Sequence, residues 1–364
     1  MSSYVILAAG GTGGHLFPAE ALAREFLVRG RPVALVTDRR GGNFPVVGVE
    51  TFRIPAGQFG AGFSAKLRGV IDLARGFLAA SRLLRRLKPG SVVGFGGYPS
   101  MPTMLAANRL GFATVIHEQN AVLGRANAML APRVDRIATH FATAEGLNSN
   151  CRDKISQTGN PVRPAIAALR DLAYAAPSGD SPFRILVTGG SQGARILSRV
   201  IPDALLSLPP DLVARIELSQ QARPEDLEAV TARYQAGGLK AEVKRFFDDM
   251  PARLGAAHLV IARAGGSTTA ELTVAGRPSI LVPYAAAIAD EQSANARNLA
   301  ERGAAWLLPE ADFTPAALAA LVTKLAVEPD LLTRAAAAAR AMGEPQAASK
   351  LADLVESVER ERRS

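Results

Sequence analysis

The segment at residues 8–15 has the composition of a loop that binds an anionic group. It contains Gly-Gly-Thr-Gly-Gly-His at residues 10–15, between an apolar run at residues 4–7 and an apolar-periodic run at residues 16–27. Glycines let the backbone turn tightly and approach a ligand without Cβ clashes. The free backbone N–H groups at a helix start bind anions such as phosphate. His15 ends the loop and would place a proton carrier beside the bound group.

Similar glycine loops recur further along the chain. Apolar runs lead into loops at residues 189–195 and 263–271, and a less complete copy lies at residues 94–100. Since every α/β sheet needs turns, one such loop is weak evidence for a ligand site. Four such loops occur here, in both halves of the chain, and binding sites explain them better than packing alone does.

Two common enzyme classes fit these loops poorly. Asp38 stands near the place of the ribose-binding acid in a dinucleotide-binding fold, but the third glycine position of that fingerprint falls on Leu16. Residues 189–193 match the serine-hydrolase pattern G-x-S-x-G, with Ser191 as nucleophile and His258 as the only later histidine. Because His258 precedes an apolar run and does not follow one, Ser191 is better explained as a phosphate-binding hydroxyl.

Polar residues also gather after the predicted strands. His-Glu-Gln-Asn occupies residues 117–120, and four successive polar side chains at a strand end are poorly explained by packing. Within residues 263–271, a Gly-Ser-Thr-Thr run supplies N–H and O–H donors, and Glu271 is placed to accept from both hydroxyls of a ribose. The alternatives are a capping acid at Glu271 and buried, hydrogen-bonded histidines at His117 and His140.

Length and composition restrict the class of protein. The chain has 364 residues, which favours two domains, and only 5% of them are aromatic, so we expect aliphatic cores. No apolar run reaches the roughly 18 residues of a membrane span, and no signal segment opens the sequence, so we expect a cytosolic protein. The single Cys151 excludes an internal disulfide, and no cysteine cluster, Asp-x-Asp or His-x-x-x-His supports a tightly bound metal.

The net charge of +9 is concentrated in one segment, residues 60–90, which contributes +6 of it. Seven basic residues there outweigh the single Asp72: Lys66, Arg68, Arg75, Arg82, Arg85, Arg86 and Lys88. On a helix, its apolar residues form one stripe: Leu67, Val70, Ile71, Ala74 and Leu78. Basic residues beside an apolar stripe favour docking on an anionic membrane, although a helix that covers its own sheet also needs such a stripe. Nucleic acid is less favoured because no aromatic residues interleave to stack on bases.

The order of the predicted elements indicates an α/β fold. Candidate strands lie at residues 4–8, 32–37, 92–94, 114–117 and 136–138, and then at 184–188, 215–219, 241–244, 259–262 and 279–282. Helical patterns alternate with these strands, which predicts two doubly wound parallel sheets joined by the proline-rich segments 160–164 and 175–182. Ligands bind such sheets outside the carboxyl ends of the strands.

Together these motifs resemble the bacterial MurG-type N-acetylglucosaminyltransferases. The matching stretches run in family order over nearly the whole chain, at residues 10–15, 96–100, 117–120, 159–163, 189–194 and 263–271. The resemblance implies a GT-B fold, with two Rossmann-like α/β domains facing a cleft. It implies an acceptor-binding, membrane-associating domain at residues 1–162, a UDP-sugar-binding domain at 163–340, and a helix at 341–364 that returns to the first domain.

The implied reaction moves N-acetylglucosamine from UDP-N-acetylglucosamine to the 4-hydroxyl of lipid-linked N-acetylmuramyl-pentapeptide, with inversion at the sugar. His15 and Glu118 would be rival general bases near the acceptor, which Tyr98 would also face. The nucleotide sugar would contact residues of both domains: Thr12, Gly13, Gly14, Asn120, Arg163, Ser191, Phe247, Gly266, Ser267, Thr268, Thr269, Glu271 and Gln292. Phe247 would lie beside the uracil and Glu271 would hold the ribose. Glu291 stands where the family often carries His or Gln.

The resemblance also implies partners and location. The enzyme would need no cofactor and no obligatory metal, and would bind peripherally to the cytoplasmic face of the bacterial inner membrane. Its partners would be UDP-N-acetylglucosamine, the undecaprenyl-linked acceptor, the anionic membrane surface and proteins of cell-wall synthesis and division, without nucleic acid. Two alternatives stay open: another GT-B transferase with a different sugar nucleotide or acceptor, and a non-catalytic nucleotide-sugar binder.

Overall fold

The computed structural model describes residues 3–10, 13–38, 44–57, 63–142, 145–190, 193–287 and 290–364. The chain divides into two compact units, the first made of residues 1–163 and 344–364 and the second of residues 164–343. The first boundary, after Arg163, lies one residue beyond the boundary that the family resemblance implies, and the second, after Gly343, lies three residues beyond its implied position. The segment after the second boundary belongs to the first unit, so the chain returns to the unit in which it began.

The first unit contains a parallel sheet with strand order β3-β2-β1-β4-β5-β6-β7. Its strands are β1 (Val5–Ala8), β2 (Val33–Thr37), β3 (Glu50–Arg53), β4 (Ser91–Gly94), β5 (Ala113–Glu118), β6 (Arg136–Thr139) and β7 (Ile155–Gln157). Its helices are α1 (Gly13–Val28), α2 (Phe63–Leu87), α3 (Ser100–Arg109), α4 (Arg125–Leu130), the 3-10 helix η1 (Ser149–Lys154) and α14 (Ala347–Arg363). The strand order reverses its direction at β1, and such a switch point is where ligands bind in open α/β sheets.

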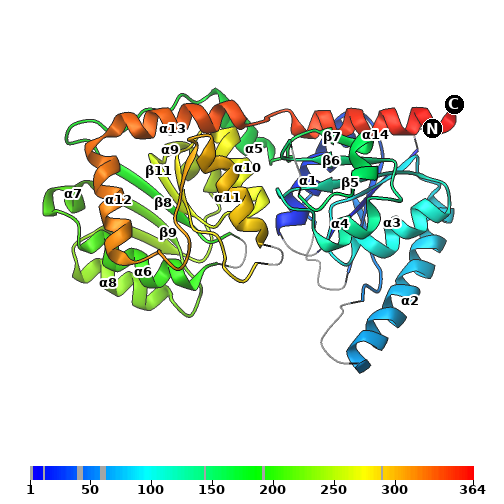
Figure 1. The fold of residues 1–364 in the computed structure, drawn as a ribbon, viewed down its shortest axis with the longest axis horizontal. Helices are drawn as coiled ribbons and strands as arrows, with labels where there is room; N and C mark the ends of the chain where they lie inside the picture. Colours follow the sequence, from blue (N-terminus) through cyan, green and yellow to red (C-terminus); the bar gives the residue numbers. More distant parts are fainter. Residues whose placement is uncertain are drawn as a thin grey trace. The chain divides into compact units, whose positions relative to one another are not determined.

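Helices cover both faces of this sheet because its strands are apolar on both faces. Val5 and Leu7 of β1 belong to a core with Val355 of α14, whereas the intervening Ile6 belongs to a second core with Leu84 of α2 and Met104 of α3. Successive side chains of a strand point to opposite faces. In Figure 1, α14 accordingly lies on one side of β5, and α3 lies on the other.

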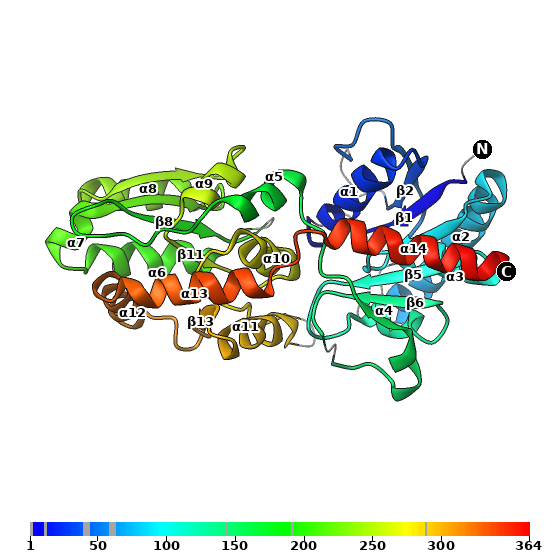
Figure 2. The same cartoon turned by 90° about the horizontal axis from the view of Figure 1, so that it is seen from above.

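The second unit contains a parallel sheet with strand order β10-β9-β8-β11-β12-β13. Its strands are β8 (Phe183–Thr188), β9 (Ile216–Gln221), β10 (Lys240–Lys244), β11 (Leu259–Ala262), β12 (Ser279–Leu281) and β13 (Ala305–Leu307). Its helices are α5 (Pro164–Ala167), η2 (Ala168–Asp171, 3-10), α6 (Arg195–Leu206), α7 (Pro210–Arg215), α8 (Leu227–Ala236), α9 (Met250–Ala256), α10 (Gly266–Ala275), α11 (Glu291–Glu301), α12 (Pro315–Val327) and α13 (Pro329–Met342). Figure 1 shows β8 and β11 between α6 on one side and the helices α9 and α13 on the other, and Figure 2 shows the same elements from above.

These two doubly wound sheets confirm the expected α/β class. The C-terminal helical stretch is broken between α13 and α14. Gly343 lies at this break, where an added Cβ would stand only 2.3 Å from the backbone oxygen of Thr273. A glycine is therefore needed there, because any side chain would push the end of α13 away from α10.

Candidate active site

Three glycine-rich or polar loops of the first unit lie at one edge of its sheet. Strands β1, β4 and β5 are neighbours and run parallel, so their carboxyl ends meet at the same edge. His15 follows β1, Tyr98 follows β4, and Glu118 is the last residue of β5. The first-unit residues expected to serve the acceptor therefore share the edge where ligands of such sheets bind.

His15 lies in the first turn of α1, half-buried, with its ring against glycines. A Cβ added to Gly96 would stand 3.3 Å from its Nε2, and one added to Gly10 would stand 3.4 Å from its Nδ1. Burial lowers the pKa of His15 to about 4, and the positive end of the helix dipole also opposes a charged imidazolium. The ring is therefore neutral at pH 7, which is the form that accepts a proton.

The carboxylate of Glu118 is buried and accepts hydrogen bonds at both oxygens. Its Oε1 accepts from the backbone N–H of Asn120 at 3.0 Å and from Nδ2 of Asn120 at 3.2 Å. Its Oε2 accepts from the backbone N–H of Gly124 and from Nδ2 of Asn127, both at 2.9 Å. Burial raises the pKa of Glu118, and these four N–H groups oppose that shift.

His117 fits the alternative of a buried, hydrogen-bonded histidine. Its Nε2 lies 2.9 Å from the backbone oxygen of Gly159, and its Nδ1 lies 3.0 Å from Nε2 of Gln119. Because a carbonyl can only accept, Nε2 carries the proton, and burial lowers the pKa of His117 to about 4. His140 is also buried, beside the ring of Phe141, and neither of its ring nitrogens has a hydrogen-bond partner among the described residues.

The other expected first-unit residues are spread along the same edge. Gly13 and Gly14 open α1, and a Cβ on Gly14 would meet no atom within 4 Å. Arg163, the last residue of the first segment of this unit, holds its guanidinium 4.8 Å from the centre of the Phe17 ring. Thr12, like Ser191 of the second unit, lies outside the described residues.

In the second unit, the N-terminus of α10 has the character of an anion site. Gly265, its N-cap residue, provides no side-chain cap, and the first residues of the helix are Gly266, Ser267 and Thr268. The side chains of Ser267 and Thr268 are half-buried, so they lie within reach of a ligand. Thr269 differs: it is fully buried, and its hydroxyl donates to the backbone oxygen of Gly266 at 3.0 Å.

Two adjacent phenylalanines after β10 have opposite environments. Phe247, the residue expected beside the uracil, is only 6% exposed, and the guanidinium of Arg253 lies 4.1 Å from its ring centre. Its neighbour Phe246 is 50% exposed. Because the side chain of Phe247 is buried under Arg253, the ring that is accessible to a planar base at this edge is that of Phe246.

A set of buried polar side chains supports the loops around α10. Arg263 donates to the backbone oxygens of Val282 and Pro283, at 3.1 Å each, and pairs with Glu310. Asn295 of α11 donates to the backbone oxygen of Ala264 at 2.9 Å. The sequence pattern included Arg263 only as the first residue of the loop at 263–271, without a role, and did not indicate Asn295. The sequence feature that could have identified their supporting roles is a polar residue directly after a strand, or one inside an otherwise apolar helix face.

Gln292 and Glu271 lie on helices that start at the same edge. Gln292 is half-buried at the start of α11, and its Oε1 accepts from the backbone N–H of Tyr284 at 3.0 Å. Glu271 is half-buried on α10, between one and two turns into the helix. Both helices follow strands of the second sheet, so the residues of this unit that are expected to bind the nucleotide sugar also share its carboxyl edge.

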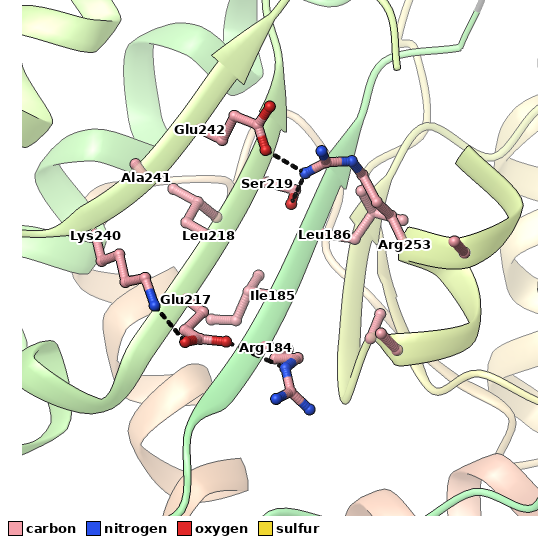
Figure 3. A pocket seen from close by; sticks show the side chains of 13 residues that line it. Arg184, Ile185, Leu186, Glu217, Leu218, Ser219, Lys240, Ala241, Glu242 and Arg253 are labelled. Atoms are coloured by element: carbon pink, nitrogen blue, oxygen red, sulfur yellow. Dashed lines mark hydrogen bonds and ion pairs between the residues drawn. The ribbon is translucent and has the colours of Figure 1, made fainter. Parts of the chain in front are cut away.

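A groove of about 450 Å³ lies elsewhere on the second unit, over the first residues of β8, β9 and β10. Its charged groups are paired: Glu217 with Arg184 at 3.1 Å and with Lys240 at 2.5 Å, and Glu242 with Arg253 at 2.6 Å. Figure 3 shows Arg253 reaching across the strands to Ser219 and Glu242. The strands begin at this groove, so it is not at the carboxyl edge.

The positions of the strands also remove the serine-hydrolase alternative. His258 precedes β11, and its Nδ1 accepts from the backbone N–H of Arg184, near the start of β8. Strand β8 ends at Thr188, before Ser191 in the sequence, and β11, which His258 precedes, runs parallel to it. The histidine therefore stands before a strand, where a triad histidine should follow one. In the described ranges, no group of three or more His, Cys, Asp or Glu side chains could hold a metal ion.

Comparison with known proteins identifies the family. The N-terminal domain model of glycosyltransferase family 28 matches residues 5–139, and the C-terminal domain model matches residues 184–356. The chain belongs to glycosyltransferase family 28. This membership confirms the expected enzyme class, a glycosyltransferase, and removes the dinucleotide-dependent alternative.

Family 28 relatives resemble the chain over nearly its full length. A Rhodospirillum centenum protein is 53% identical over 353 residues, which cover 96% of this chain and 93% of the relative. A Rhodospirillum rubrum protein is 54% identical over 355 residues, covering 97% and 91%. Both are named UDP-N-acetylglucosamine--N-acetylmuramyl-(pentapeptide) pyrophosphoryl-undecaprenol N-acetylglucosamine transferase.

A solved structure gives the same result for this family 28 chain. The crystal structure of Acinetobacter baumannii MurG matches with a TM-score of 0.79 and 30% identity, covering 98% of this chain and 99% of that one. The resemblance to MurG-type enzymes and the GT-B fold that it implies are confirmed.

Proposed function

We propose that this protein transfers N-acetylglucosamine from UDP-N-acetylglucosamine to N-acetylmuramyl-pentapeptide carried on pyrophosphoryl-undecaprenol. The observation that carries the proposal is the identity of about half of all residues, over nearly the whole chain, to enzymes named for this reaction. The glycine loops at the carboxyl edges of both sheets support it, because the donor and the acceptor each contain a pyrophosphate.

The donor binds the carboxyl edge of the second sheet. The N–H groups and hydroxyls at the start of α10, from Gly266, Ser267 and Thr268, meet the phosphates, and Glu271 accepts from the ribose hydroxyls. The exposed ring of Phe246 lies on the uracil, in place of the buried Phe247. Ser191, at the glycine loop after β8, contributes a further hydroxyl, and Gln292 reaches the sugar.

The acceptor binds the first unit near His15. Its 4-hydroxyl oxygen attacks the anomeric carbon of N-acetylglucosamine, the bond from that carbon to the UDP oxygen breaks, and the hydroxyl proton passes to the neutral imidazole. UDP leaves with the bonding electron pair. Helix N-termini and fixed N–H groups stabilise the charge that develops on the pyrophosphate, and they need no reorganisation during the step.

Helix α2 docks the enzyme on an anionic membrane surface. Val70, Ile71 and Leu78 are 54%, 41% and 53% exposed, so this apolar stripe does not cover the sheet of its own unit. The basic side chains beside it are exposed as well: Arg68, Arg75, Arg82, Arg85, Arg86 and Lys88. The side chains of Lys66 and Leu67 lie outside the described part of the chain.

The position of α2 supports its proposed role in binding the enzyme to the surface of a membrane. Figure 1 shows the N-terminal half of α2 projecting away from the strands of the first unit. Within the residues that the structure covers, no helix is long and apolar enough to cross a bilayer. An exposed apolar stripe flanked by basic residues is the pattern of a helix that lies in the membrane interface.

One assay tests the proposed reaction. Purified protein is incubated with UDP-N-acetylglucosamine labelled in the sugar, and with the lipid-linked acceptor in detergent or vesicles. The proposal expects label in the lipid product and release of UDP in equal amounts. Transfer that requires another sugar nucleotide would point to a different GT-B transferase, and donor binding without transfer to any acceptor would point to a non-catalytic binder.

A further inference from the structure

We propose that Glu118 is a positioning residue for His15, acting through the side-chain amide of Asn127 and the turn at Gly96 and Gly97. This inference rests on the proposed transfer reaction and assigns different tasks to the two residues that could serve as its base. His15 takes the proton, and Glu118 fixes the wall against which the His15 ring lies.

The first observation is that the Glu118 carboxylate has no acceptor position left for a substrate hydroxyl. A carboxylate offers about four acceptor positions. Asn120, Gly124 and Asn127 supply four N–H donors to the two oxygens, at 2.9 to 3.2 Å. A general base must be within hydrogen-bond reach of the proton that it takes, and here the protein's own N–H groups occupy those directions.

The second observation is that Asn127 is held in one orientation. Its Nδ2 donates to Oε2 of Glu118 at 2.9 Å and to the backbone oxygen of His117 at 3.1 Å, which uses both amide hydrogens. The side chain is 2% exposed. With two acceptors on the same nitrogen, the amide cannot flip without losing both hydrogen bonds. The carboxylate therefore sets the position of the amide group.

The third observation places Gly96 between this amide and the His15 ring. A Cβ added to Gly96 would stand 3.6 Å from Nδ2 of Asn127 and 3.3 Å from Nε2 of His15. Gly97 also faces the ring, since its added Cβ would stand 3.6 Å from Nδ1 of His15. Both glycines have positive φ, 88° and 75°, so this turn needs glycine for its backbone as well as for space.

The hydrogen bonds of Asn127 and the place of Gly96 beside both side chains form one path from Glu118 through Asn127 and Gly96 to His15. A displaced carboxylate would leave the amide with only its hydrogen bond to the His117 backbone oxygen, so the amide could shift and the turn against the imidazole would lose part of its support. A misplacement of about 1 Å in a reacting group can cost on the order of 100-fold in rate. Loss of Glu118 should therefore lower kcat by displacing the ring of His15, and it should leave the binding of the nucleotide sugar unchanged.

The test is a double-mutant cycle on kcat with Glu118→Gln and His15→Ala. Glu118→Gln keeps the size of the side chain but presents N–H groups to N–H donors, and we expect a 10- to 100-fold lower kcat with an unchanged KM for UDP-N-acetylglucosamine. In the His15→Ala background, Glu118→Gln should have no further effect. A further loss of tenfold or more in that background would overturn the proposal and make Glu118 an independent base.

Gly96→Ala tests the same path without changing Glu118, in case Glu118→Gln unfolds the first unit. Gly48→Ala is the matched control, because Gly48 has a similar φ of 85° and an added Cβ there would meet nothing within 4 Å. We expect at least a tenfold lower kcat for Gly96→Ala and an unchanged kcat for Gly48→Ala. Equal kcat values for the two variants would refute the path. Absence of transfer by the wild type would instead refute the proposed function.

Discussion

The guanidinium of Arg31 lies 2.8 Å from the carboxylate of Glu359, although the two residues are 328 positions apart in the sequence. Ser91, at the start of β4, donates its hydroxyl to the same carboxylate at 2.6 Å. Glu359 is 6% exposed. The end of α14 is therefore tied to the residues that lead into β2 and β4, and the helix is part of the structure of the first unit.

Replacing Glu359 by Ala should lower the free energy of unfolding of the first unit by about 1.5–3 kcal/mol, the usual contribution of hydrogen bonds to a charged group, because Arg31 and Ser91 would both lose this carboxylate. Urea denaturation followed by far-UV circular dichroism measures this change. Glu361→Ala is the control on the same helix. Glu361 pairs with Arg136 at the surface and is 51% exposed, so its loss should cost less than about 1 kcal/mol. Equal losses for the two variants would contradict the argument.

The two phenylalanines after β10 should separate binding from stability. Phe246→Ala should weaken UDP binding by about 1–3 kcal/mol, the usual contribution of a ring stacked on a base, and leave the Tm nearly unchanged. Phe247→Ala should instead lower stability by about 3–5 kcal/mol, because it opens a cavity under Arg253. Calorimetric titration with UDP and thermal unfolding of both variants distinguish these outcomes. The opposite pattern would return the uracil contact to Phe247.

Buried histidines predict that the first unit loses stability in mild acid. Burial lowers the pKa values of His15 and His117 to about 4 and that of His140 to about 3. Unfolded histidine has a pKa near 6.5, so between pH 6.5 and 4 the unfolded chain binds more protons than the folded one. Stability must therefore fall as the pH drops through this range, by up to about 1.4 kcal/mol per pH unit for each histidine.

His140→Leu should remove one of these contributions without loss at neutral pH. Neither ring nitrogen of His140 has a hydrogen-bond partner among the described residues, so an apolar side chain of similar size leaves nothing unpaired. His117→Leu is the contrasting variant, since it removes the hydrogen bond from Nε2 of His117 to the Gly159 carbonyl and the one between Nδ1 and the Gln119 amide. Denaturation at pH 7 and pH 5 should show a flatter pH dependence for His140→Leu. A loss at pH 7 as large as that of His117→Leu would rule this out.

His15→Ala should lower kcat by roughly 10²–10⁴-fold, the usual effect of losing a general base. Donor affinity should stay unchanged, because the proposed donor residues of the second unit do not include it. In the wild type, the low pKa of His15 keeps the base neutral, so kcat should not fall as the pH drops through 6.5, where an unperturbed histidine would become charged. Steady-state kinetics and UDP titration measure both quantities, and wild-type turnover in His15→Ala would exclude His15 as the base.

The sequence predicts the central strands well and the edge strands poorly. Strands β1, β4 and β11 are short, mostly apolar runs that are buried along their whole length, and their pattern is visible without a structure. Strands β3, β7 and β13 were not predicted. They lie at the edges of their sheets, where residues such as Glu50 and Gln157 remain exposed. An edge strand needs fewer apolar residues, so its pattern resembles that of a loop.

The candidate site also divides into features that the sequence predicts and features that depend on the fold. The glycine loops and the polar residues at strand ends were predictable, because strand, glycine loop and helix are adjacent in sequence. The choice between Phe246 and Phe247 was not, because adjacent side chains in an extended segment point to opposite sides and only packing decides which side is covered. The proposed difference in role between His15 and Glu118 also depends on residues that are distant in the sequence and close in the fold, such as Gly96 and Asn127.

The exposed stripe on α2 leads to a prediction on membrane binding. Changing Val70, Ile71 and Leu78 to Ser should reduce co-sedimentation with vesicles that contain anionic lipid, because each removes apolar area that would enter the interface. Changing Arg75, Arg82 and Arg85 to Gln should weaken binding by about 3 kcal/mol at low salt, roughly 1 kcal/mol for each charge. Arg86 is left unchanged, because its guanidinium lies 5.4 Å from the centre of the Phe52 ring.

The control for this experiment is a variant with Val28 and Val47 changed to Ser. Both side chains belong to the first unit, lie outside α2, and are 86% and 96% exposed. If general surface hydrophobicity were responsible, the control would lose as much binding as the α2 variant. If α2 is the docking element, the control sediments like the wild type, and salt releases the wild type from anionic vesicles because the charge contribution is screened. Equal binding of wild type and both α2 variants would exclude this helix as the membrane contact.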